Sequence, residues 1–243
     1  MMTLNDFIEK NIKLFEDRNY SQIYLNTLLQ ELAPADVGNL TALLERIEER
    51  PLDYMRRIPD YFLYAQSIKQ FDIPSQVHTI EDGAFQKSQL ESIHVPGHIL
   101  VVGDNAFNTC TNLKSIQLDD GIQMLGVNAF RRCPITKIDL PASITDIGRG
   151  CFGQTSLQEC ILPSITSIPD YLFAFCSYLT KVVIPTSVTK IGESVFAASM
   201  SLERIIYEGT LKQWYAVDRH THWNRGGFVR EVICSDGVDR LSR

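Results

Sequence analysis

The chain has 243 residues, of which 44% are hydrophobic, and its formal net charge is -6. Such a chain can bury a hydrophobic core, which excludes a disordered or fibrous protein. The negative net charge argues against general binding to nucleic acid, although a chain with this net charge can still carry a local basic strip. No stretch reaches the ~20 apolar residues of a membrane span, and the N-terminus lacks the pattern of a signal peptide. We therefore expect a cytoplasmic protein.

Residues 1–56 are predicted to form a helical unit. Apolar residues recur at roughly helical spacing from Leu4 to Phe15, and similar patterns predict helices near 23–32 and 40–47. Such a unit would cover the open end of a repeat array. The alternative is that these helices dock the protein onto a larger assembly.

Residues 57–207 contain an internal repeat. Its most regular feature is a phenylalanine that recurs with spacings of 22, 23, 22, 21 and 23 residues, at Phe85, Phe107, Phe130, Phe152, Phe173 and Phe196. Aliphatic residues keep fixed distances from it, so each unit reads L-x-x-I-x-I-P-x-x-V-x-x-I-x-x-x-A-F with modest drift. A degenerate copy precedes these six, because Ile58 to Leu63 nearly repeats Ile168 to Phe173. The sequence thus predicts about seven stacked units.

Each unit is predicted to add one strand to a solenoid. The segment L-x-x-I-x-I alternates at period two, so one strand face is buried when the units stack about 4.8 Å apart. Prolines follow this segment and mark a corner, where a missing N–H does not interrupt the ladder. They stand at positions 74, 96, 141, 163 and 185. We expect the recurring phenylalanines to stack on one another at the next corner.

The six cysteines form no C-x-x-C pair, and all but Cys234 occupy positions related by the repeat. Cys110, Cys133 and Cys176 each stand three residues after a phenylalanine, where other units carry serine or threonine. A small residue that hydrogen-bonds a turn backbone fits this position. We therefore expect reduced, mostly buried thiols, and we discount a catalytic Cys–His pair because a buried thiol is protonated and inert.

These units resemble the leucine-rich repeats of the BspA-like family, which occurs in bacterial surface proteins, some parasites and bacteriophage genomes. The resemblance covers residues 57–235. With the predicted helices it implies an α+β protein: a leucine-rich repeat solenoid of about seven rungs at 57–207, a helical N-terminal cap or docking unit at 1–56, and a C-terminal cap at 208–243. It implies binding to proteins or surfaces rather than a reaction.

The C-terminal segment departs from the repeat. A helix is predicted from Thr210 to Val217 and a last strand over 228–234, followed by a turn at Asp236-Gly237. This segment resembles the C-terminal cap of BspA-like arrays, in which a tryptophan-bearing helix and a strand ending in C-x-D-G close the column. The matching residues are Trp214, Trp223, Cys234, Asp236 and Gly237.

Motifs for catalysis are lacking. The chain contains no glycine-rich phosphate loop, H-E-x-x-H or G-x-S-x-G. The best metal-like cluster is His220, His222, Cys234 and Asp236, because H-x-H can present two imidazoles on one side of an extended segment. The C-terminal cap already accounts for Cys234 and Asp236. We therefore expect no enzymatic activity, cofactor or metal, and a metal-dependent enzyme is the least favoured alternative.

The strand register predicts an outward stripe that is polar at its start and apolar at its end: His94, Gln117, Asp139, Ile161, Val183 and Ile206. Two residues earlier runs a stripe richer in charge, in which Glu159 would lie between two lysines on adjacent rungs: Ser92, Ser115, Lys137, Glu159, Lys181 and Arg204. We predict that a protein partner docks on Ile161, Val183 and Ile206, bordered by Glu159, Lys181 and Arg204. Ordinary solvated sheet surface is the alternative.

The sequence therefore favours a non-enzymatic protein-binding or structural scaffold. The short N-terminal unit joined to BspA-like repeats resembles phage-encoded members, which would make the protein a virion component or an intracellular factor that binds a host protein. The alternative is an F-box-like recruiting adaptor, although no convincing F-box motif aligns to residues 20–56. We expect a protein partner and no nucleic acid.

Overall fold

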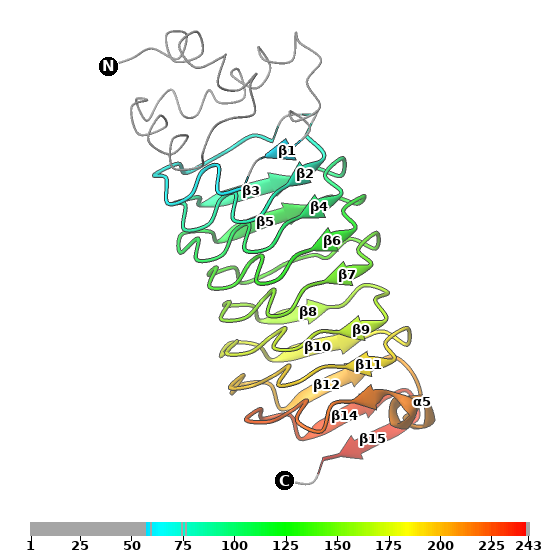
Figure 1. Ribbon diagram of the computed structural model, residues 1–243. Helices are drawn as coiled ribbons and strands as arrows, with labels where there is room; N and C mark the ends of the chain where they lie inside the picture. Colours follow the sequence, from blue (N-terminus) through cyan, green and yellow to red (C-terminus); the bar gives the residue numbers. More distant parts are fainter. Residues whose placement is uncertain (1–56, 59, 74, 76, 242–243) are drawn as a thin grey trace, which may run out of the picture.

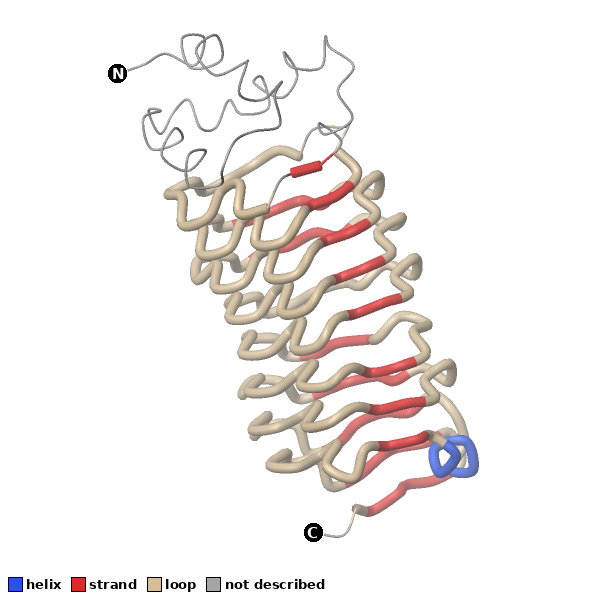
Figure 2. Tube along the Cα trace, in the orientation of Figure 1, coloured by secondary structure: helices blue, strands red, loops and turns tan. Residues whose placement is uncertain are grey.

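The protein forms a β-solenoid of about eight turns that stack along one axis, from β1 to β15 (Figure 1). The computed structural model describes residues 57–58, 60–73, 75 and 77–241. The predicted leucine-rich repeat solenoid is confirmed, whereas the helical cap predicted for residues 1–56 lies outside the described residues. Within the described ranges, α5 (Leu211–Ala216) is the only α-helix (Figure 2). No helix in that part of the chain is long and apolar enough to cross a membrane.

The predicted strands form one side of the solenoid, which we call the long-strand face. They are β3 (Ser92–Val95), β5 (Ser115–Leu118), β8 (Glu159–Ile161), β10 (Lys181–Ile184), β12 (Arg204–Tyr207) and β14 (Glu231–Cys234). Except for β5 and β8, neighbouring strands pair in parallel and in register, and β15 (Gly237–Arg240) closes this face by pairing antiparallel with β14. Along β10 the side chains of Val182 and Ile184 are buried in the core, as the period of two requires.

The long-strand face is interrupted between β5 and β8. The repeat predicts a strand through Ile138 and Leu140, but residues 133–140 have no regular secondary structure. Pro134 lies within this segment and has no amide hydrogen to donate to the ladder. The face is therefore divided into a two-stranded and a five-stranded sheet.

A second row of strands, which the sequence analysis did not predict, forms the short-strand face. Each of these strands has two residues: β1 (Arg57–Ile58), β2 (Thr79–Ile80), β4 (Val101–Val102), β6 (Met124–Leu125), β7 (Asp146–Ile147), β9 (Ser167–Ile168), β11 (Lys190–Ile191) and β13 (Asp218–Arg219). They pair in parallel in two groups, one of five strands and one of three. Two residues are too few for an alternating pattern to appear in the sequence.

The expected phenylalanine stack runs through the core at the loop corner between the two faces. Six phenylalanines, from Phe85 to Phe196, are fully buried, with ring centroids 5.0 to 6.0 Å apart and planes within 18° of parallel. Phe71 closes one end edge-on at 5.2 Å and Trp223 closes the other at 6.0 Å. Because each turn contributes one ring to the column, the rings link neighbouring turns.

The small residues three positions after each phenylalanine form a second column. The Cys110 thiol donates to the carbonyl oxygen of Phe85 at 3.0 Å, and the Ser199 hydroxyl donates to that of Phe173 at 2.6 Å. The Cys176 thiol donates to the Phe152 carbonyl oxygen at 3.1 Å. These bonds join adjacent turns, which confirms the structural role predicted for this position.

The C-terminal segment adds an eighth turn, so the predicted number of seven rungs is too small. In it, β13 pairs with β11 and β14 pairs with β12, both in parallel. The helix α5 is inserted between Tyr207 and β13, which lengthens the turn and conceals it from a search for a fixed period. The helix predicted from Thr210 to Val217 is present as α5, which begins after Thr210, and Thr210 forms a capping box with Gln213. Buried Trp214 donates its indole N–H to the Asp239 carboxylate at 2.9 Å, which ties α5 to β15.

Candidate functional site

Apolar side chains follow one line across the outer surface of the five-stranded sheet, and we call this line the apolar row. Strand register places Val183 beside Ile161 and Ile206. Beyond the predicted residues, the row continues to Ile233 on β14 and Val238 on β15, which pair with Ile206 and with each other. Five adjacent strands therefore carry one aliphatic residue each at this position.

The apolar row is unevenly exposed. Ile161 is 59% exposed and Val238 46%, whereas Val183 is only 9% exposed. The expectation that Val183 is an open surface residue was wrong. Ile161 and Ile206 lie in register on both sides of it, and side chains on adjacent strands stand close enough to cover a smaller residue between them.

A row of charged side chains borders the apolar row, two residues earlier on each parallel strand. Lys181 pairs with Glu159 at 3.4 Å, Arg204 with Glu231 at 2.9 Å, and Arg240 with Glu231 at 3.5 Å. We call these five residues the charged row. They are partly or largely exposed, so the pairs contribute little to stability but fix the pattern of charge beside the apolar residues.

The expected bridge from Lys137 to Glu159 is not formed. Lys137 instead contacts Asp139 of its own segment at 3.0 Å. Residues 133–140 form no strand, so Lys137 is not held in register with Glu159 of β8. The charged row therefore begins at Glu159.

A cavity of about 360 Å³ adjoins the apolar row at the interruption of the long-strand face. Its lining includes Ile161, Pro163, Pro185 and Glu208, together with residues 137–140 and Ala142. The most exposed residue of the apolar row therefore stands at the rim of a concave surface. Such a rim is a suitable place for an anchoring side chain of a partner.

The first part of the outward stripe is polar, as predicted. His94 lies 2.8 Å from the Asp119 carboxylate, and Gln117 donates to the same group at 3.0 Å. These two hydrogen bonds hold the pKa of Asp119 below its ordinary value. The stripe thus changes from a hydrogen-bonded polar surface at β3 and β5 to an apolar surface at β8 and beyond.

The residues considered for catalysis are not arranged as a reactive site. The rings of His220 and His222 are 5.6 Å apart, but Asp236 accepts a hydrogen bond from the backbone of Leu211 and Cys234 is buried. No group of three His, Cys, Asp or Glu residues in the described ranges could hold a metal ion. Burial raises the pKa of the Cys151 and Cys160 thiols well above the ordinary range, so these groups are protonated at neutral pH.

Two solved leucine-rich repeat proteins share this architecture. A leucine-rich repeat protein from T. pallidum matches with a TM-score of 0.52 and 26% identity over 57% of this chain and 72% of that one. One from Bacteroides ovatus matches with a TM-score of 0.50 and 22% identity over 74% of this chain and 59% of that one. The pneumococcal vaccine antigen PcpA matches with a TM-score of 0.47 and 24% identity. That match covers 62% of this chain and 48% of PcpA.

The sequence comparison is more specific. No curated protein matches the chain. A family model for the BspA type leucine rich repeat region matches in six copies, over residues 44–114 and 101–216. These matches contain the phenylalanine stack, the column of small residues that follows it, and the three strands β8, β10 and β12 that carry the predicted patch. The chain belongs to the BspA-type leucine-rich repeat family.

Proposed function

We propose that this protein is a non-enzymatic scaffold that binds a protein partner on the outer surface of its five-stranded sheet. The observation that carries the proposal is the apolar row, which crosses five adjacent strands and is bordered by the charged row. Scattered exposed aliphatic residues are normal on a protein surface, whereas aliphatic residues aligned across adjacent strands, here with Val183 covered by its neighbours, indicate an interface.

The two rows suit different parts of an interface. Ile161 and Val238 offer the most exposed aliphatic surface, and the cavity beside Ile161 can receive a side chain of the partner. The charged row then forms a polar rim, in which alternating acidic and basic groups orient the partner and add little affinity. Membership of a repeat family whose units present an extended surface supports this proposal.

The two more specific roles considered for the chain have less support. A recruiting adaptor of the F-box type depends on the N-terminal helices, and these fall in residues 1–56, outside the described residues. The structural relatives named above are bacterial proteins, and no feature of the described chain favours a phage role. We therefore retain the general scaffold as the proposed function.

The test is affinity capture of partners from a lysate of the native host, with Ile161→Glu as the disrupting variant. A carboxylate in the middle of an apolar contact is desolvated without a counter-charge, so we expect the captured partner to bind at least about tenfold more weakly, or about 1.4 kcal/mol. Val183→Glu is a poorer choice because Val183 is buried in the free protein, and the variant would lose stability.

The matched control is Met200→Glu, because Met200 is 62% exposed and lies outside both rows. Thermal unfolding should show that Ile161→Glu and Met200→Glu are equally stable. If the partner binds the Ile161→Glu and Val238→Glu variants as tightly as the unmodified chain, it does not use this face and the proposal is wrong.

A further inference from the structure

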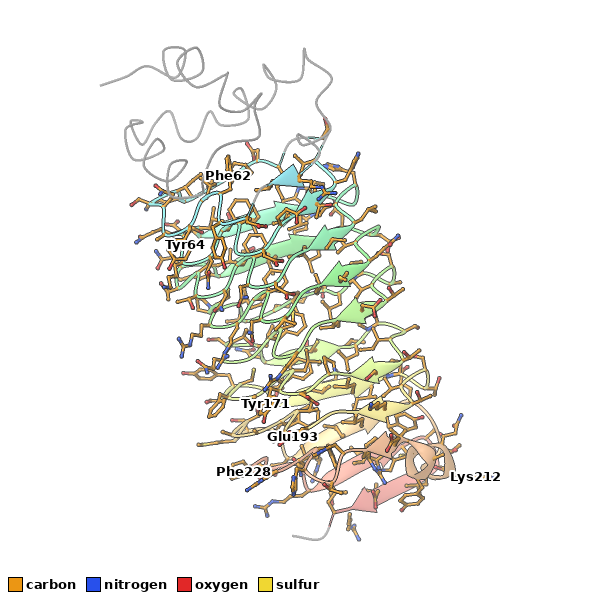
Figure 3. All side chains as sticks on the ribbon, viewed as in Figure 1. Phe62, Tyr64, Tyr171, Glu193, Lys212 and Phe228 are labelled. Atoms are coloured by element: carbon orange, nitrogen blue, oxygen red, sulfur yellow. The ribbon has the colours of Figure 1, made fainter. Side chains whose placement is uncertain are left out.

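A recess of about 410 Å³ lies at the loop corner, away from the apolar row, between the turns that contain Phe130 and Phe173. Its lining consists of Asn128, Arg131, Arg149, Gln154, Tyr171 and Phe175, together with small residues. Tyr171 is labelled on this corner in Figure 3. Guanidinium groups, side-chain amides and aromatic rings thus face one small volume.

Missing side chains create the recess. Gly153 occupies the position directly after the phenylalanine, where earlier turns carry Gln86, Asn108 and Arg131. Gly150, with a φ of 63°, also lacks a side chain, and a Cβ there would come within 2.6 Å of Asn128 Oδ1. The turn on the other side has only Ala174 at the position of Gly153. The long side chain of Arg131 therefore borders a notch instead of packing against an equivalent side chain.

The arginines at this recess have no carboxylate partner. Within the described ranges, no ion pair involves Arg131 or Arg149, although the charged row on the other side of the molecule is fully paired. Arg149 lies over the ring of Tyr171, 4.7 Å from its centroid, and this contact leaves its charge uncompensated. Two unpaired cations at one recess are notable in a chain whose net charge is -6. They favour an anionic ligand.

Phe175 supplies an exposed aromatic surface at the rim of the recess. It is 54% exposed although it is large and apolar, and its φ of 63° lies in the left-handed region. A bulky residue there is strained by roughly 1–2 kcal/mol, and the equivalent positions carry smaller or polar residues such as Ala198 and Gln154. Core packing does not explain this placement, because the side chain faces solvent. A flat ligand could cover the ring.

The backbone amides at the recess are already hydrogen-bonded, so they are not available to an extended peptide. The Gly150 amide donates to the Asp170 carbonyl oxygen at 2.9 Å, that of Gly153 to Gly150 at 2.9 Å, and that of Gln154 to Ala174 at 2.8 Å. Strand addition needs free main-chain donors and acceptors, and these three donors are used within the solenoid. Recognition here must therefore come from side chains.

We infer that this recess binds an acidic saccharide. The carboxylate or sulfate group of the sugar pairs with the forked guanidinium groups of Arg131 and Arg149. The Gln154 side-chain oxygen already accepts from Arg132 Nε at 2.7 Å, so the amide nitrogens of Asn128 and Gln154 supply donors for hydroxyl groups, and the apolar face of the sugar ring packs on Phe175. The site is separate from the surface assigned to a protein partner, so each can fail without the other.

Isothermal titration of the full chain tests this inference, with a hyaluronan hexasaccharide as the carboxylate probe and a heparin-derived hexasaccharide as the sulfate probe. We expect one or both to bind at about 0.15 M salt, where weak surface attraction is screened, and neutral maltohexaose to bind at least tenfold more weakly. The difference between the first two identifies which acidic group the arginines select.

Three variants locate the site. Arg131→Gln and Arg149→Gln should each weaken binding by about tenfold or more, because each removes one charged fork. Gly153→Gln should block the recess with the residue found at the equivalent position 86; a Cβ there lies 3.2 Å from the Gly150 carbonyl oxygen, so a small shift accommodates it. The control Lys190→Gln removes a charge from β11 and should leave binding unchanged. Thermal unfolding of each variant separates lost binding from lost folding.

Several outcomes would overturn the inference. It fails if neither acidic hexasaccharide binds the unmodified chain, or if Lys190→Gln weakens binding as much as Arg131→Gln does, which indicates attraction without a site. It fails also if an octaglutamate peptide binds as tightly as the saccharides and is equally sensitive to Gly153→Gln. That result would assign the recess to an acidic peptide.

Discussion

The phenylalanine stack offers a direct test of how this solenoid is held together. Phe152 lies in the middle of the stack, is fully buried, and contacts Phe130 with ring centroids 6.0 Å apart and Phe173 at 5.9 Å. We predict that Phe152→Ala lowers the free energy of unfolding by about 3–5 kcal/mol, the range for removing a buried phenylalanine and leaving a cavity. Part of this loss, about 0.5–1.5 kcal/mol for each ring pair, comes from the two stacked contacts.

Two further variants separate the contribution of the ring contacts from that of the buried volume. Phe152→Leu keeps most of the buried volume but loses both ring contacts, so it should cost less than Phe152→Ala and more than about 1 kcal/mol. Phe175→Ala removes the same side chain from an exposed position, and it should change stability by less than about 1 kcal/mol.

Urea denaturation followed by circular dichroism measures these differences. Because each turn of a solenoid contacts only its neighbours, a cavity in the middle can also uncouple the two halves, and a smaller m-value or a second transition would reveal it. The reasoning is refuted if Phe152→Ala is no more destabilising than Phe175→Ala. Such a result would mean that the aliphatic strands hold the turns together without the ring column.

Two other predictions concern backbone strain and the buried thiols. Ala198 has a φ of 55°, so Ala198→Gly should leave stability unchanged or raise it by up to about 1 kcal/mol, whereas Ala197→Gly next to it should lower stability by about 0.5–1 kcal/mol in the same denaturation assay. Burial raises the pKa of Cys151 and Cys160, so these thiols stay protonated in the folded state while the unfolded chain releases their protons. Stability should therefore be intact below the unfolded-state pKa of about 8.5 and fall as pH rises above it, by up to about 1.4 kcal/mol per pH unit for each thiol. The double variant Cys151→Ala/Cys160→Val, which carries residues found at equivalent positions, should show a shallower decline between about pH 8.5 and 10, and an equal slope would contradict the assignment.

Much of the fold could be predicted because a stacked repeat places equivalent residues in contact. The spacing of Phe85, Phe107 and the later phenylalanines was sufficient to predict a column of rings, and the alternation in L-x-x-I-x-I predicted which strand residues are buried. The position of Cys110 also predicted its bond to a turn carbonyl group. These inferences need only the period and the chemistry of one unit.

The candidate site was predicted in part. The register placed Ile161, Val183 and Ile206 in one line, but the sequence did not show that Val183 is covered by its neighbours. Ile233 could have been found, because the predicted strand over 228–234 carries the same alternation. Val238 required the antiparallel pairing of β15, which follows the turn and has no counterpart in the repeat.

The sequence by itself determined the solenoid and most of the residues that fill its core, because similar units must bury their apolar faces against one another. Only the tertiary structure decided the features in which one turn differs from the next. These are the break in the long-strand face at 133–140, the eighth turn concealed by α5, and the recess where Gly153 faces Arg131. Each feature depends on how the side chains of two different adjacent turns pack against each other, and a pattern averaged over the repeats does not contain that information.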